Sequence, residues 1–155
     1  VANYSISPNR TTADELCAQA ASGGIISGIQ SSEEYNYVLD TMQVQVDERT
    51  RCTEKIWSAY WIGGVRTAKC MNLPPTVAGC GAENAFEIDD PTWTLPGYFK
   101  WLETEPNNSY DNENCLAIRL GGIANGMNDN ACSWTEENKK QCVLGSVCGV
   151  KPSQP

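Results

Sequence analysis

Two stretches in the first third of the chain have the pattern of helices. Residues Thr12 to Glu15 form a capping box, and the helix that follows is expected to stop at Gly23-Gly24. A second capping box at residues 31–34 opens a run with the apolar spacing of an amphipathic helix, predicted to fade by about Val46. The apolar stripe of this second helix, expected in the core, is Tyr35, Val38, Leu39 and Met42.

Short apolar runs in the rest of the chain predict strands. Residues 56–62 are rich in aromatic and β-branched side chains, and Gly63-Gly64 is expected to end that strand. Residues 1–10 fit either a short edge strand or a loose arm. Two early helices and later short, antiparallel-looking strands indicate an α+β domain. The other expected strands lie within residues 25–29, 86–91, 115–120 and 142–148.

Composition and charge exclude several classes of function. The 155 residues fit one domain, and no apolar run approaches the ~20 residues that a membrane span needs. The net charge of −8 disfavours nucleic acid as a partner, because that role calls for a basic patch. The absence of histidine excludes Ser-His-Asp and Cys-His catalysis and His-ligated zinc. With no nucleophile motif and no cofactor fingerprint either, we expect no enzyme.

The eight cysteines point to an oxidising compartment. Their number is even and none of them forms a Cys-x-x-Cys pair, which favours four disulfides over zinc or reduced thiols. Three Asn-x-Ser/Thr sequons, beginning at Asn3, Asn9 and Asn107, add a little to the same interpretation. We therefore expect a secreted, extracellular protein.

Oxygen-bearing side chains concentrate between Glu105 and Asp129. The region between Gly64 and Cys115 has little regular pattern, and a long irregular stretch in a compact domain is usually functional. Acidic and amide oxygens converging from separate turns are what a hard cation such as Ca²⁺ requires. The alternative is an ordinary polar surface loop, because Asn, Asp and Ser are common turn residues.

Several short motifs occur along the chain in an informative order and spacing. Each is weak alone, and their joint arrangement is specific. The first helix carries a cysteine, a Gly-Gly-Ile-Ile run follows it, and a Ser-Glu-Glu sequence opens the second helix. The remaining motifs are Trp61-Ile62-Gly63-Gly64, Glu105-Pro106-Asn107, Glu113 two residues before Cys115, and Asn128-Asp129 three residues before Cys132.

Together these marks resemble the C-type lectin-like domain over about residues 14–150. The resemblance implies two helices packed on two small antiparallel sheets, with a long calcium-binding loop. The sequence departs from the family pattern at Gly64, where Leu is usual, and at Met127, where Trp is usual. The expected division is an N-terminal arm at residues 1–13, a carbohydrate-recognition domain at 14–150, and a tail at 151–155.

The same resemblance implies one Ca²⁺ site that also holds the sugar. Three carboxylates would over-neutralise a divalent ion, and two amides would add further oxygens, leaving places for sugar hydroxyls. Glu-Pro-Asn resembles the motif of members that bind mannose, fucose or N-acetylglucosamine, and implies a cis Pro106. Asn108 and Asn114 replace the acids of members with a second calcium site, so one ion is expected. The implied ligands of both metal and sugar are Glu105, Asn107, Glu113, Asn128 and Asp129.

The resemblance also implies two of the disulfides. These are Cys17–Cys148, from the first helix to the last strand, and Cys115–Cys132, at the base of the binding loop; Cys142 competes with Cys148 for Cys17. Cys70–Cys80 and Cys52–Cys142 are the expected pairings of the remaining four.

The function implied is that of a secreted, Ca²⁺-dependent lectin for glycans with mannose-type terminal sugars. Single-site binding would be weak, with Kd on the order of millimolar. Oligomerisation would then supply avidity. The alternatives from other classes are a structural or surface-adsorbing protein that binds mineral or ice, or a protein-binding module, on the same fold.

Overall fold

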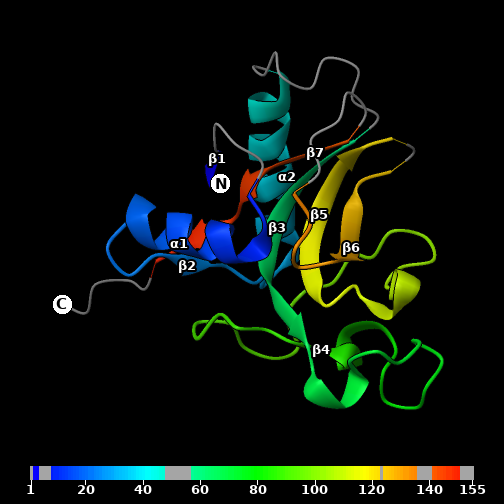
Figure 1. Cartoon of the computed structure of the whole chain (residues 1–155). Helices are drawn as coiled ribbons and strands as arrows, with labels where there is room; N and C mark the ends of the chain where they lie inside the picture. Colours follow the sequence, from blue (N-terminus) through cyan, green and yellow to red (C-terminus); the bar gives the residue numbers. More distant parts are fainter. Residues whose placement is uncertain (1, 4–7, 48–56, 123, 136–140, 151–155) are drawn as a thin grey trace.

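The computed structural model of the chain describes residues 2–3, 8–47, 57–122, 124–135 and 141–150. Two helices, α1 (Arg10–Ala20) and α2 (Ser32–Asp47), precede most of the strands (Figure 1). Three short 3-10 turns lie in the irregular region, at Ala68–Cys70, Ala82–Ala85 and Ser109–Asp111. The strands are β1 (Ala2–Asn3), β2 (Ile25–Ile26), β3 (Trp57–Arg66), β4 (Phe86–Glu87), β5 (Cys115–Gly121), β6 (Gly126–Asn130), β7 (Gln141–Ser146) and β8 (Cys148–Gly149).

Two sheets are present, as the sequence predicts. The larger has the order β1-β7-β3-β5-β6 with β4 added to β3, and β2 pairs with β8 in a separate small sheet. Neighbouring strands are antiparallel except for β3 and β7, which run parallel. The α+β architecture is therefore confirmed, and Ala2–Asn3 form a short strand at the edge of the large sheet.

The two helices cover opposite faces of the large sheet. Tyr60 and Ile62 of β3 pack with α2, whereas Ala59 and Trp61 pack with α1, as expected from the alternation of side chains along a strand. In the predicted stripe of α2, Tyr35, Val38 and Met42 are buried and Leu39 is partly buried. The stripe thus lies in the core, as predicted.

The first helix begins earlier than the sequence suggested. Asn9 is its N-cap, and the Asn9 side chain accepts a hydrogen bond from the Thr12 backbone N–H at 2.8 Å. The predicted cap at Thr12 is wrong because Asn is at least as good a cap, and because Arg10 pairs with Asp14 and Asp89. At α2 the predicted cap is confirmed in part. Ser31 accepts from the Glu34 N–H, but Glu34 accepts from the Gln30 N–H instead of reaching back to Ser31.

The strand β3 continues through the two glycines that were expected to end it. Its register against β5 shifts between Trp61 and Val65, so Gly63 and Gly64 form an irregularity inside the strand. Gly64 has φ of +144°, and a Cβ there would lie 2.4 Å from Leu116 Cδ1. This explains why glycine stands where the family pattern has Leu.

The other strands differ in extent from the prediction. Only Ile25–Ile26 and Phe86–Glu87 are strand within the two short predicted segments, and the last segment divides into β7 and β8. The polar strand β6 was missed, because Asn and Asp are depleted in strands.

Three of the predicted disulfides are present. Cys17–Cys148 ties α1 to β8, Cys70–Cys80 closes a local loop, and Cys115–Cys132 joins the start of β5 to the segment after β6. Cys52 lies outside the described residues, so Cys52–Cys142 stays a prediction. Within the part of the chain that is described, no helix is both long and apolar enough to span a bilayer.

The glycine in β3 gives a first testable expectation. Restoring the family residue with Gly64→Leu should lower the free energy of unfolding by about 1–3 kcal/mol, because the side chain would overlap Leu116 at a strained φ. Denaturant unfolding measures this. Gly81→Ala is the control, because Gly81 has φ of −90° and its added Cβ would approach only Pro75 O, at 3.2 Å. Equal effects of the two substitutions would contradict the explanation.

Candidate functional site: a carboxylate cluster on β6

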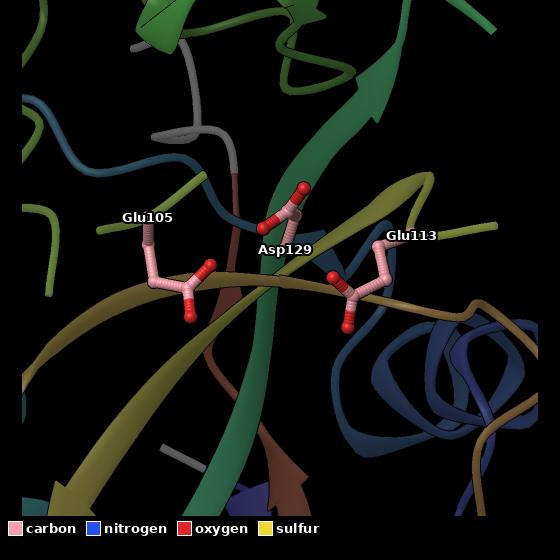
Figure 2. Close-up of side chains that lie close together, drawn as sticks. All are labelled: Glu105, Glu113 and Asp129. Carbon is pink, nitrogen blue, oxygen red and sulfur yellow. The ribbon is translucent and has the colours of Figure 1, made fainter. Parts of the chain in front are cut away.

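Three carboxylates from separate segments meet at β6. One oxygen from each of Glu105, Glu113 and Asp129 lies within 4.8 Å of the other two. Figure 2 shows Glu105 and Glu113 on either side of Asp129. Two oxygens on opposite sides of a bound calcium ion are about 5 Å apart, so this spacing suits a common ion.

Backbone pairing brings the loop before β5 against β6. Met127 donates its backbone N–H to Lys100 O at 2.7 Å, and Leu102 donates to Met127 O at 3.0 Å. A turn then follows in which Glu105 N–H bonds to Leu102 O, and the Glu105–Pro106 peptide is cis, as expected. Met127, which replaces the family's Trp, is buried in the core.

Asp129 is the anchor of this loop. Its side chain is fully buried, and Oδ2 accepts from Arg66 Nη2 at 2.6 Å and from the Asn108 N–H at 2.8 Å. Oδ1 accepts one hydrogen bond, from the Asn107 N–H at 3.1 Å. Because a carboxylate oxygen has two lone pairs, Oδ1 keeps one for a metal ion.

Asn108 links the two acidic ends of the loop. It is buried with φ of +49°, in the left-handed region that Asn tolerates better than most residues. Its Oδ1 accepts from the Glu113 N–H at 3.0 Å, and its Nδ2 donates to Leu73 O at 2.8 Å. The Glu113 carboxylate in turn accepts from the Ser109 N–H at 2.7 Å. The loop is thus fixed by its own polar groups.

Four of the five predicted site residues line one hollow of about 610 Å³. These are Glu105, Asn107, Glu113 and Asn128, while Asp129 lies beneath them, buried. Tyr110 stands almost fully exposed at the rim. The structure therefore gathers all five residues around one place, in two layers.

Two oxygens at this place have no hydrogen-bond partner. Glu105 Oε2 and Asn128 Oδ1 are both buried acceptors without a donor. Buried acceptors left unpaired are costly, and a cation would satisfy both. The donor set is entirely oxygen, as hard cations such as Ca²⁺ prefer. The residues present therefore fit a calcium ion.

The pKa values of two of these carboxylates are raised. Burial raises the pKa of Glu105 to about 7, and the nearby Asp129 charge adds to the effect. Burial likewise raises the pKa of Glu113 to about 7, against the hydrogen bond from Ser109. An ion of charge +2 beside these carboxylates would favour their charged forms and so lower both pKa values.

Sequence reasoning missed several residues of the site. The roles of Arg66, Asn108 and Asn130 depend on strand register and loop path, which the sequence does not show. Arg119 could have been found from the sequence, since it is a charge inside an otherwise apolar strand. Trp57 and Trp134 are partly buried against the core, and both also line the hollow.

The Arg66–Asp129 pair yields a second expectation. Arg66→Met should cost about 3–5 kcal/mol of stability, because it leaves a buried carboxylate without its charge partner. The double variant with Asp129→Asn should cost less than the sum of the single variants. Unfolding by denaturant in the presence of chelator measures this cycle, and strictly additive costs would contradict the coupling.

The raised acidities yield a third expectation. The folded pKa values of Glu105 and Glu113, about 7, lie above the ordinary 4.5, so folding disfavours their charged forms. That penalty is present above pH 7 and is lost as the pH falls from 7 toward 4.5. In chelator, these two groups should therefore add stability on acidification from pH 8 to 5.5.

The matched measurement is the unfolding free energy against pH for the double variant Glu105→Gln/Glu113→Gln. Its profile should lack the gain seen in the parent protein over that range. Parallel profiles for the two proteins would contradict the assignment.

Comparisons with known proteins place the chain in a family. Residues 2–151 match the family described as C-type lectin domain-containing protein 141/158. No curated protein sequence matches the chain. Several solved structures share the fold at low sequence identity.

One similar structure is the EPNH mutant of CEL-I, a C-type lectin from Cucumaria echinata. Its identity is 20% and its TM-score 0.56, over 85% of this chain and 80% of that one. The C-type lectin domain of murine dendritic cell inhibitory receptor 2, in complex with N-glycan, has 20% identity and a TM-score of 0.54, over 84% and 79%. Herring type II antifreeze protein has 21% identity and a TM-score of 0.55, over 96% and 87%.

The three structures show the fold, and the sequence match extends over nearly the whole chain. This protein belongs to the C-type lectin domain family described as C-type lectin domain-containing protein 141/158.

Proposed function

We propose that this chain is a secreted, Ca²⁺-dependent lectin for mannose-type sugars. The observation that carries the proposal is the convergence of unpaired acceptors, Glu105 Oε2 and Asn128 Oδ1, on the carboxylate cluster. The C-type lectin domain is a non-enzymatic, carbohydrate-binding fold, so the chain would act by binding alone.

Four residues that line the hollow would hold calcium together with the buried Asp129 below them. Glu105, Glu113 and Asp129 supply charge, and Asn107 and Asn128 supply amide oxygens. Calcium takes about 6–8 oxygens, so five side chains leave places for ligand. The bound ion would supply a Lewis-acidic centre for hydroxyl oxygens.

The protein's own groups would orient the sugar. Two vicinal equatorial hydroxyls, such as O3 and O4 of mannose, could each donate to Glu105 or Glu113 and accept from the amide of Asn107 or Asn128. Hydrogen bonds to ionised groups are roughly twice as strong as neutral ones, so the placement of Glu and Asn around the ion would decide which pair of hydroxyls fits. The Glu105-Pro106-Asn107 order supports the mannose-type class. Asn128 keeps one amide hydrogen free, since the other is donated to Asn130 Oδ1 at 3.2 Å.

Other features of the chain agree with an extracellular binding role. Three disulfides cross-link the described part of the chain, and disulfides persist in oxidising compartments. The hollow is open and mostly polar-lined, so binding to one sugar would be weak, with Kd on the order of millimolar. Presentation of several copies would raise the avidity.

Affinity chromatography tests the proposal. The protein should bind mannose resin in calcium, elute with chelator or free mannose, and elute poorly with galactose. Glu105→Gln with Asn107→Asp should shift the preference toward galactose by reversing the donor and acceptor order. Glu103→Gln is a control for the Glu-to-Gln change, because it makes that change at an exposed neighbour outside the cluster and should leave the sugar preference unchanged.

Retention on the resin in the presence of chelator would contradict the proposal. A glycan array without hits, together with adsorption to ice or mineral, would favour the surface-adsorbing alternative on the same fold.

A further inference from the structure

A second recognition element stands beside the candidate calcium site. Arg119, on β5, lines the same hollow as Glu105 and Asn128. Its guanidinium carbon lies 4.4 Å from the centroid of the Trp57 ring, within the range of a cation–π contact. Trp57 in turn packs against Trp134, with ring centroids 5.2 Å apart. The guanidinium is thus held on an aromatic support built from two other segments.

Two hydrogen-bond donors at this place are unused. Arg119 Nε is buried and has no acceptor. Asn130 Nδ2, which belongs to another residue lining the hollow, is also buried without an acceptor, while its Oδ1 accepts from Asn128. Buried donors without partners are uncommon and call for an explanation. A ligand that brings acceptor oxygens would satisfy them.

The charge balance points to the kind of ligand. The charges of Glu105, Glu113 and Asp129 would be matched by one calcium ion together with Arg66, which is paired with Asp129. Arg119 would then be an unbalanced positive charge at the hollow. Without calcium, its neighbour Glu105 offsets it, and this charge acts against the lowering of the Arg119 pKa by burial.

One further acid lies close by. Glu103 lines an adjoining hollow of about 380 Å³ that also touches Arg119 and Glu105. Its charge would repel an anion on that side. An anionic group would therefore be drawn to the side of Arg119 that faces Asn130 and the calcium site.

We propose that Arg119 and Asn130 form an anion subsite next to the sugar, so that the preferred ligands are mannose-type sugars bearing an oxyanion substituent. The inference rests on the proposed lectin function and names its substrate class. Sulfate esters and carboxylates share the required chemistry, because a guanidinium matches the two oxygens of either group with its planar fork. A substituent at C6 fits best, since it leaves O3 and O4 free for calcium.

The test compares three ligands by competition in calcium: methyl α-mannoside, its 6-sulfate, and the corresponding 6-carboxylate, a mannuronide. At low salt at least one charged ligand should bind about fivefold or more tighter than the neutral one, an advantage worth about 1 kcal/mol. Raising the salt should shrink that advantage. The sulfate and carboxylate arms identify which oxyanion is preferred.

Variants assign the effect to the residue. Arg119→Gln should bring the ratio of charged to neutral affinity close to one. Lys69→Gln is the matched control, because it removes the same charge at an exposed residue that does not line this hollow, and it should leave the ratio unchanged. Arg119→Lys, which keeps the charge and the stem, should retain an intermediate ratio and serves if the Gln variant fails to fold.

Equal affinity of the parent protein for all three ligands would overturn the inference and leave the lectin proposal standing. A preference for the charged ligands that persists unchanged in Arg119→Gln would also overturn it. So would a ratio of charged to neutral affinity that is the same in Arg119→Lys as in Arg119→Gln. Failure of the parent protein to bind any of the three in calcium would overturn both proposals together.

Discussion

The buried ion pair between Arg66 and Asp129 is the interaction on which the binding loop depends. Both side chains are fully buried, and the arginine also donates Nε–H to Glu113 O at 3.0 Å. Its backbone N–H bonds to Asn114 O, so the end of β3 holds the second half of the loop. Asp129 holds the first half through the N–H groups of Asn107 and Asn108. The two residues therefore connect β3, β6 and both arms of the loop.

This pair also offsets the repulsion between Asp129 and the other two carboxylates of the site. A buried pair is by itself weak evidence of stability, because desolvation offsets the attraction. Its value here is positional: the Asp129 carboxylate can be buried beside two other acids because Arg66 carries the opposite charge. Glu105 and Glu113 form no buried ion pair of this kind among the described residues, and burial raises the pKa of each to about 7. Under the proposed function, the site would give up some stability for the capacity to bind a cation.

Local spacing and motif order allowed much of the fold and part of the site to be predicted. The α2 stripe, the three observed disulfides and the cis Pro106 depend on short-range pattern or on the family resemblance. The gathering of Glu105, Asn107, Glu113 and Asn128 follows from the same motifs.

What the sequence did not disclose depends on long-range register. Arg66 reaches Asp129 because β3 and β6 flank β5, across 63 residues of sequence. The strand β6 was missed because its last three residues, Asn-Asp-Asn, have low strand propensity and are stabilised by pairing with β5. The two glycines of β3 were predicted to end the strand, but they form an irregularity inside it. Only the structure shows why a side chain is excluded at Gly64, because the excluding contact is with Leu116 on β5. Arg119 was not singled out, and its support by Trp57 depends on tertiary packing.

Calorimetric titration of calcium into protein stripped with chelator, at pH 8, tests the central claim most directly. The account predicts uptake of one ion per chain, because the described residues hold one cluster of carboxylates and Asn108 and Asn114 stand where a second site would need acids. It also predicts loss of that uptake in Glu105→Gln/Glu113→Gln. No uptake by the parent protein, or equal uptake by the double variant, would contradict it.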